Sequence, residues 1–143
     1  MSEQENIKAA SSFFDAWNSG DLSKSAPYEA SDMKVEAPGA SGPLDREQNR
    51  KYNQNFLTAF PGSKFEVVLT VAQGDYVVMN WTITGKNTGA LQSPTGSTIP
   101  STGKVSSIVG STTSLIKNGK IVHAWTYWDM ASFLTQLGLM PPM

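Results

Sequence analysis

Cysteine is absent from the sequence, which excludes disulfide bonds, thiolate metal ligands and cysteine nucleophiles together. Charge is scarce as well: charged residues make up 16%, the net charge is −1, and no basic stripe exists to neutralise phosphates, so nucleic-acid binding is not expected. No apolar run approaches the roughly 20 residues that span a bilayer. The polar, acidic N-terminus is not typical of a signal peptide. We therefore expect a cytoplasmic protein with no membrane partner.

Aromatic residues are plentiful, with four Trp, four Tyr and six Phe, and this content excludes a disordered chain. A length of 143 residues is typical of one domain with a substantial core. No internal repeat and no long linker divides the chain. We predict a single domain over residues 1–143.

The first helix is predicted from its ends and its apolar face. Ser2 and Glu5 form a capping-box pattern, and Phe14 and Trp17 then share one helical face. Gly20 is a typical residue just beyond a helix C-terminus. These signals agree with one another and predict a helix between residues 2 and 20.

Further helical segments follow the same logic. Asp45, with Gln48 three residues later, is expected to cap a helix that ends at Pro61-Gly62. A short helical turn is predicted over residues 21–28, and a C-terminal helix over residues 130–139.

The second half of the chain is predicted as a strand meander. Asn118-Gly119 is the strongest short hairpin signal in the sequence, and a loop rich in Gly, Ser, Thr and Pro covers residues 86–103. Helices followed by strands indicate an α+β fold with an antiparallel sheet that curls around the helices and leaves a pocket if they do not fill it. The predicted strands are residues 33–37, 64–72, 76–84, 104–117 and 120–128.

Four segments, in order over nearly the whole chain, carry a family resemblance. They are residues 60–62 (FPG) before a strand, residues 81–89 (WTITGKNTG), residues 100–104 (PSTGK), and the ending, in which residues 118–125 (NGKIVHAW) precede Trp128-Asp129 and QLGL. Together they resemble the SnoaL-like polyketide cyclases of the nuclear transport factor 2-like superfamily. The resemblance implies a conical, curved antiparallel sheet wrapped around N-terminal helices, with a C-terminal helix, enclosing an apolar pocket. It also implies a homodimer.

The resemblance further implies cofactor-free cyclisation of a polyketide by intramolecular aldol condensation. Asp129 matches the position of the aspartate that acts as general acid/base in such enzymes. Two positions depart from the family: Asn87 stands where His is common, and His123 stands where Glu is common. The superfamily also contains isomerases, dehydratases and members with no known reaction, so the fold does not settle the function.

One face of the last strand is predicted to combine an imidazole, two aromatic rings and a carboxylate, namely His123, Trp125, Tyr127 and Asp129. Val122, Ala124, Thr126 and Trp128 are predicted on the other face. A carboxylate among aromatic groups loses hydration and becomes a better proton acceptor, able to remove a proton flanked by two carbonyls. The alternative for Asp129, which precedes the final helix, is an N-cap, and both roles could hold at once.

The remaining candidates each have a structural alternative. His123 is a candidate acid/base partner or a packed, hydrogen-bonded histidine; with no second His, a metal site is not expected. Asn87 could donate a hydrogen bond to a substrate oxygen or serve in a turn. Four aromatic residues could stack on a flat substrate or belong to the core or a subunit interface: Trp81, Trp125, Tyr127 and Trp128. Trp17, on the first helix, is expected in the core or at the pocket wall, where it could contact a substrate.

Two functions from different classes remain open, together with a weaker third. The first is a cofactor-free acid/base enzyme (cyclase, isomerase or dehydratase) that acts on an apolar carbonyl compound, with Asp129 as proton carrier. The second is a non-catalytic module that binds an apolar small molecule. The third is homodimerisation through the exposed sheet face with a vestigial pocket.

Overall fold

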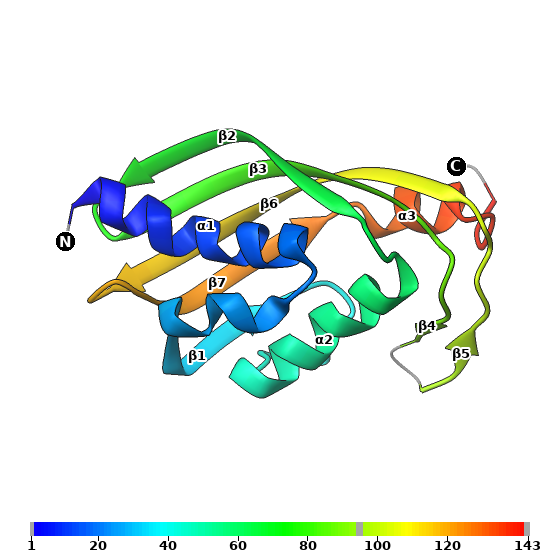
Figure 1. The fold of residues 1–143 in the computed structure, drawn as a ribbon, viewed down its shortest axis with the longest axis horizontal. Coiled ribbons are helices and arrows are strands. Elements are labelled where there is room, and N and C mark those ends of the chain that lie inside the picture. The colour runs from blue at the N-terminus through cyan, green and yellow to red at the C-terminus, as the bar shows by residue number, and fades with distance from the viewer. Residues whose placement is uncertain (1, 94–95, 142–143) are drawn as a thin grey trace.

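A computed structural model of the chain describes residues 2–93 and 96–141 (Figure 1). Within these residues, no helix is both long and apolar enough to cross a membrane. The elements in chain order are α1 (Glu3–Ser19), the 3-10 helix η1 (Leu22–Tyr28), β1 (Glu29–Glu36), α2 (Arg46–Ala59), β2 (Lys64–Gln73), β3 (Tyr76–Lys86), β4 (Leu91–Gln92), β5 (Thr98–Ile99), β6 (Val105–Lys117), β7 (Lys120–Trp128) and α3 (Met130–Gln136).

A curved, open five-stranded sheet carries the fold, in the order β1-β7-β6-β3-β2. The α+β class predicted from the sequence is therefore confirmed. The sheet is not wholly antiparallel, because β1 pairs with β7 in parallel. Hydrophobic alternation predicts that β1 is a strand but contains no information about its partner, which lies 89 to 92 residues away in the chain, so this pairing was not foreseen.

The helix ends follow the capping signals. The Ser2 side chain accepts a hydrogen bond from the Glu5 backbone N–H, and Gly20 ends α1 in the left-handed conformation with φ of 83°. Asp45 and Gln48 form a reciprocal capping box at the start of α2. The last helix, α3, ends at Gln136 rather than at residue 139, because Gly138 has a φ of 75° and turns the chain away.

The predicted hairpin between β6 and β7 is present. Asn118 and Gly119 have φ values of 52° and 74°, the pair of positive values that this type of tight turn requires. The segment over residues 86–103 is not purely a loop, since β4 and β5 form a two-residue antiparallel ladder within it. Residues 94 and 95 of that segment lie outside the described residues.

The main core lies between α1 and the sheet. Figure 1 shows α1 lying over one face of the sheet. Ala9 and Ala10 are buried on α1 and allow the helix to approach the strands closely. On the sheet, Gly110 of β6 faces the Trp81 ring, and a Cβ at this glycine would overlap the indole. The absence of a side chain at Gly110 therefore makes room for Trp81, which faces a cavity.

Candidate functional site

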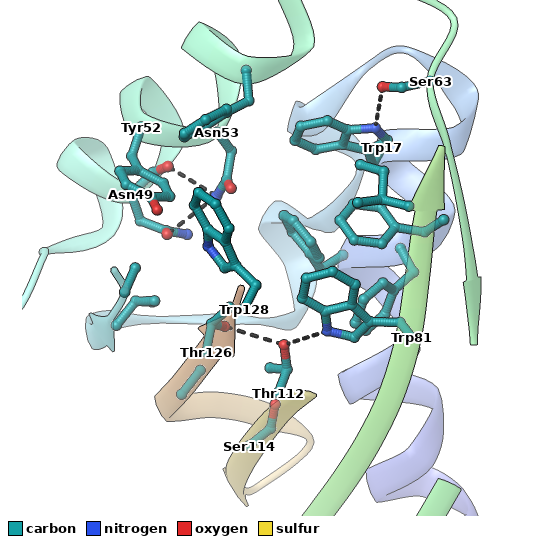
Figure 2. Close-up of a pocket in the computed structure, with 18 of the residues that line it drawn as sticks. Trp17, Asn49, Tyr52, Asn53, Ser63, Trp81, Thr112, Ser114, Thr126 and Trp128 are labelled. Atoms are coloured by element: carbon teal, nitrogen blue, oxygen red, sulfur yellow. Dashed lines mark hydrogen bonds between the residues drawn. The ribbon is translucent and has the colours of Figure 1, made fainter. Parts of the chain in front are cut away.

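The helices do not fill the space beside the sheet, and a cavity of about 130 Å³ remains (Figure 2). Its wall is mostly apolar, with contributions from α1, α2, α3 and the strands β1, β2, β3, β6 and β7. Ten aromatic residues line it: Phe13, Phe14, Trp17, Tyr52, Phe56, Phe60, Phe65, Trp81, Trp128 and Phe133. A cavity with an apolar wall therefore lies beside the sheet, and its use as a ligand pocket stays a prediction.

These rings hold one another in fixed orientations. Phe65 packs edge-to-face against both Trp17 and Trp81, with ring centroids 5.2 and 5.0 Å apart. The Trp17 Nε1–H donates a hydrogen bond of 3.0 Å to the Ser63 hydroxyl, as Figure 2 shows. On the opposite side, Trp128 packs edge-to-face against Phe56. The shape of the apolar wall is therefore set before any ligand enters.

A polar strip from α2 interrupts the apolar wall (Figure 2). The Asn53 side-chain amide donates to the backbone carbonyl and side-chain oxygen of Asn49, at 3.0 and 3.1 Å. The Tyr52 hydroxyl donates to the Pro38 carbonyl at 2.7 Å. Burial raises the pKa of Tyr52 to about 12, although a hydrogen bond with Trp128 acts in the opposite direction. This strip is therefore neutral near pH 7.

Glu29 is the one carboxylate among the described residues that line the cavity. It is 6% exposed, and its Oε1 lies 3.2 Å from Arg46 Nε and 2.9 Å from Arg50 Nη2. Its Oε2 accepts a hydrogen bond of 3.1 Å from the Ser25 hydroxyl. Both oxygens of this carboxylate therefore already have partners within the protein.

A chain of hydrogen bonds crosses the floor of the cavity from β3 to β7. The Trp81 Nε1–H donates to the Thr112 hydroxyl at 3.0 Å, and the Thr112 and Thr126 hydroxyl oxygens lie 3.1 Å apart. Two residues further along β6, the buried Ser114 also faces the cavity. Figure 2 shows these hydroxyls on neighbouring strands.

The predicted site residues divide between the cavity and the outside of the sheet. Trp17 and Trp81 line the cavity, and their contact with a substrate stays a prediction. His123, Trp125 and Tyr127 do not line it. The alternation along the strand was predicted correctly for these residues, but the cavity lies on the other face, where sequence periodicity alone could not place it.

The side chains on the outer face of β7 make contacts of their own. His123 Nε2 lies 2.8 Å from Glu36 Oε2, and the imidazole stacks on Trp125 with ring centroids 4.1 Å apart. Tyr127 is 64% exposed. These side chains therefore make surface contacts rather than a shared pocket.

Asp129 is exposed and caps α3. Its Oδ1 accepts a hydrogen bond of 2.9 Å from the Ser132 backbone N–H. The N-cap alternative is confirmed. A catalytic role for Asp129 stays a prediction, and the residue does not line the cavity.

Asn87 is 2% exposed and fully hydrogen-bonded. Its amide NH₂ donates to the carbonyls of Ala59 and Gly89, and its side-chain oxygen accepts from the backbone N–H and the hydroxyl of Thr102. Two donors and two lone pairs are the whole capacity of an amide side chain. Asn87 therefore joins the loop to the end of α2 and has no hydrogen bond left for a ligand.

Several polar residues of the cavity were not singled out from the sequence, and a bulge changes which apolar residues of β7 face the cavity. The β6–β7 register shifts between Leu115 and Ile116, so that Ile121 and Ala124 both face inward although they are three residues apart. Thr126 carried a usable signal, because alternation had already grouped it with Trp128. No pattern in the sequence indicated that Asn49, Asn53 and Glu29 would face the cavity.

Residues 2–93 and 96–141 contain no group of three or more His, Asp or Glu side chains arranged to hold a metal ion.

Comparisons with known proteins agree with the fold described above. The family model described as SnoaL-like polyketide cyclase matches residues 8–137. Among solved structures, IdmH from Streptomyces antibioticus, a proposed polyketide cyclase, is similar with a TM-score of 0.79 and 27% identity, over 93% of this chain and 98% of that one. A comparison with curated proteins gives no match.

Two further solved structures share the fold at lower identity. AclR from Streptomyces galilaeus, a proposed hydroxylase, has a TM-score of 0.85 and 24% identity over 98% of this chain and 100% of that one. A proposed SnoaL-like polyketide cyclase from Jannaschia sp. CCS1 has a TM-score of 0.84 and 17% identity over 98% and 95% of the two chains.

Proposed function

Because this chain belongs to the SnoaL-like polyketide cyclase family, we propose that it binds an apolar carbonyl compound of the polyketide type in the cavity and favours ring closure by holding it folded. The observation that carries this proposal is the composition of the wall, in which aromatic rings are combined with neutral hydrogen-bonding groups. The similarity to IdmH, a proposed polyketide cyclase, supports the same substrate class.

Positioning is the main contribution proposed for this wall. A chain with several carbonyls is flexible in water, and ring closure requires two distant atoms to meet. Holding reacting groups in a productive geometry can lower a barrier by roughly 7–11 kcal/mol. Edge-to-face rings that are already fixed, such as Phe65 against Trp81, provide a rigid surface for this purpose.

An aldol closure also needs a proton to leave the carbon between two carbonyls and a proton to reach the new alkoxide. The only carboxylate among the described cavity-lining residues, Glu29, is held by two arginines. We therefore assign the cavity wall the roles of shape and neutral hydrogen bonding. Water takes the proton that leaves the carbon and returns one to the new alkoxide, and no cofactor takes part in the proposed chemistry.

Binding tests this function directly, with the bicyclic ketone 1-indanone as the probe and calorimetry as the readout. Ala124→Leu places a larger side chain in the cavity, and Tyr127→Leu alters the outer face of the same strand. We expect Ala124→Leu to weaken binding by about 10-fold or more, because the cavity is small and overpacking is costly. Equal binding by both variants, or no binding by the unmodified protein, would refute the proposal.

Proton transfer by Asp129 is the second candidate function. Asp129 directly follows Trp128 and lies four residues before Phe133, and both of these line the cavity. Asn is as good an N-cap as Asp, so Asp129→Asn removes the acid and keeps the helix. With a synthetic aryl triketone as substrate, positioning by the cavity predicts that this variant retains ring closure, whereas a proton carrier at Asp129 predicts that it loses it.

Homodimerisation stays a prediction from the family resemblance. Leu69, Val109 and Tyr127 are apolar or aromatic and exposed on the outer face of the sheet. Light scattering of the purified protein would test it, with Val109→Lys expected to shift a dimer to the monomer.

A further inference from the structure

We propose, building on the function proposed above, that the Thr112–Thr126 hydroxyl pair is a binding subsite for a ligand carbonyl oxygen. The pair lies on the cavity floor where β6 and β7 meet, and it is surrounded by apolar and aromatic wall. A ketone oxygen bound here would have its ring system against the rings of the wall. The subsite would therefore fix the orientation of an otherwise apolar ligand.

This inference rests on a count of the polar hydrogens that are available for hydrogen bonds on the cavity floor. An indole N–H can only donate, so Trp81 must be the donor in its bond to Thr112. Trp81, Thr112 and Thr126 together bring three polar hydrogens, and the two bonds that link them use two. One hydroxyl hydrogen therefore remains without an acceptor in the chain, whichever of the two threonines donates to the other.

The free hydrogen is expected at Thr126. Head-to-tail chains of hydrogen bonds polarise one another, which favours Trp81 donating to Thr112 and Thr112 donating to Thr126. In that arrangement the Thr126 hydroxyl is the terminal donor, and both threonines line the cavity. Thr126 is half-buried and its hydroxyl faces a mostly apolar cavity, so an acceptor in the cavity is favoured.

A second donor lies next to the pair. Ser114 is 3% exposed and faces the cavity from the same side of β6 as Thr112. Its hydroxyl makes no hydrogen bond to any other residue within 2–93 and 96–141. The floor of the cavity therefore presents more donors than the protein itself uses.

The chemistry of these donors defines the ligand class. Hydroxyls are neutral, and no Lys, Arg or His is among the described residues that line the cavity. A carboxylate or phosphate would lose its hydration here without a cation in compensation. A ketone or quinone oxygen loses much less, so the subsite fits an uncharged carbonyl rather than an acid.

A matched pair of ligands tests the subsite. 1-Indanone and indane share one bicyclic skeleton and differ in the carbonyl, and their Kd ratio measures what the oxygen contributes. We expect the unmodified protein to bind 1-indanone about 10-fold more tightly than indane. Thr112→Val/Thr126→Val should bring this ratio close to one, because valine keeps the shape of threonine and its methyl group covers the Trp81 N–H.

Three variants serve as controls. Thr113→Val makes the same change on the outer side of β6, since Thr113 pairs with Trp125, and it should leave the ratio unchanged. Thr126→Ser keeps a hydroxyl and should retain most of the preference. Ser114→Ala should lower it less than the double variant does. Unchanged affinity for indane shows that the cavity of each variant is intact; if the double variant loses indane binding, Thr112→Val/Thr126→Ala, which also removes both hydroxyls, is used for the ratio and should lower it.

The outcomes separate the two proposals. A ratio that stays the same in the double variant, or in Thr112→Val/Thr126→Ala when that variant replaces it, overturns the hydroxyl subsite and leaves the apolar cavity as the binding site. A ratio abolished by Ser114→Ala alone assigns the oxygen to Ser114 and also overturns the pair. Failure of both ligands to bind the unmodified protein overturns the proposed function and the subsite together.

Discussion

The two faces of β7 differ in the chemistry that they present. Toward the helices, the strand presents Ala124, Thr126 and Trp128, which are all uncharged. Toward the outside it presents His123 and Tyr127, and His123 is paired with Glu36. The outer face has the residue types that suggest acid/base catalysis, whereas the inner face has the cavity.

This difference has a physical cause. A charged side chain on the inner face would be buried between the sheet and the helices, where a charge without a partner is costly. The one carboxylate on the described inner wall, Glu29, is accompanied by two arginines. Outside, water stabilises titratable groups without such partners. Titratable side chains are therefore more easily accommodated on the hydrated outer face. In this sheet, such residue types indicate a binding site only where a cavity lies beside them.

The largest expected effect comes from deleting one tryptophan on each face. Trp128→Ala removes a ring that packs on Phe56 and Phe133, and it should lower the free energy of unfolding by about 3 kcal/mol. Trp125→Ala removes a ring stacked on His123 at the surface and should cost about 1 kcal/mol or less. Urea unfolding measures both, and similar losses would contradict the contrast between the faces.

Alkaline unfolding tests the buried tyrosine. The pKa of Tyr52 is raised from 10.0 to about 12, so above pH 10 the unfolded chain loses this proton before the folded chain does. Its stabilisation is therefore fully present below pH 10 and is lost as the pH rises through 12, by on the order of 2 kcal/mol. This part of the pH dependence should vanish in Tyr52→Phe and persist in Tyr127→Phe, and its persistence in Tyr52→Phe would contradict the assignment.

Substitution of Glu29 and of Glu36 compares a buried ion pair with an exposed one. Glu29→Gln weakens two close contacts to arginine in a buried setting and should cost about 2 kcal/mol. Glu36→Gln weakens the His123 contact at the surface and should cost less than about 0.5 kcal/mol. Thermal unfolding at low and high salt measures both; an equal cost would show that Glu29 is better hydrated than its burial indicates.

The last comparison concerns the helix cap at Asp129. Asp129→Ala removes the bond to the Ser132 N–H and should cost about 1 kcal/mol, whereas Asp129→Asn should be nearly neutral. Chemical denaturation of the two variants provides the comparison. A large loss of stability in Asp129→Asn would mean that the carboxylate has a partner beyond the helix cap.

Local signals in the sequence predicted the local structure well. Ser2, Gly20 and the Asp45–Gln48 box mark helix ends because a cap depends on residues within one turn. Asn118-Gly119 marks a hairpin for the same reason. The parallel pairing of β1 with β7 joins segments far apart in the chain, and no local pattern encodes it.

The candidate site was predicted less well, because it depends on which face of β7 the helices cover. Strand alternation separates Trp125 from Trp128 but treats the two faces alike. The bulge near residue 122 changes the alternation as well, and Ile121 joins the inner face because of it. The polar residues Asn49 and Asn53 are brought to the cavity only by the docking of α2, which the sequence of α2 does not specify.

The central claim, that ligands bind on the inner face of β7, is tested most directly by the four indole N–H resonances of the protein during titration with 1-indanone. Trp17, Trp81 and Trp128 line the cavity, and Trp125 is the tryptophan on the outer face. Each resonance can be assigned by a Trp→Phe variant. We predict saturable shifts for the three cavity tryptophans and none for Trp125. A saturable shift of Trp125 alone would place the ligand on the outer face and contradict this account.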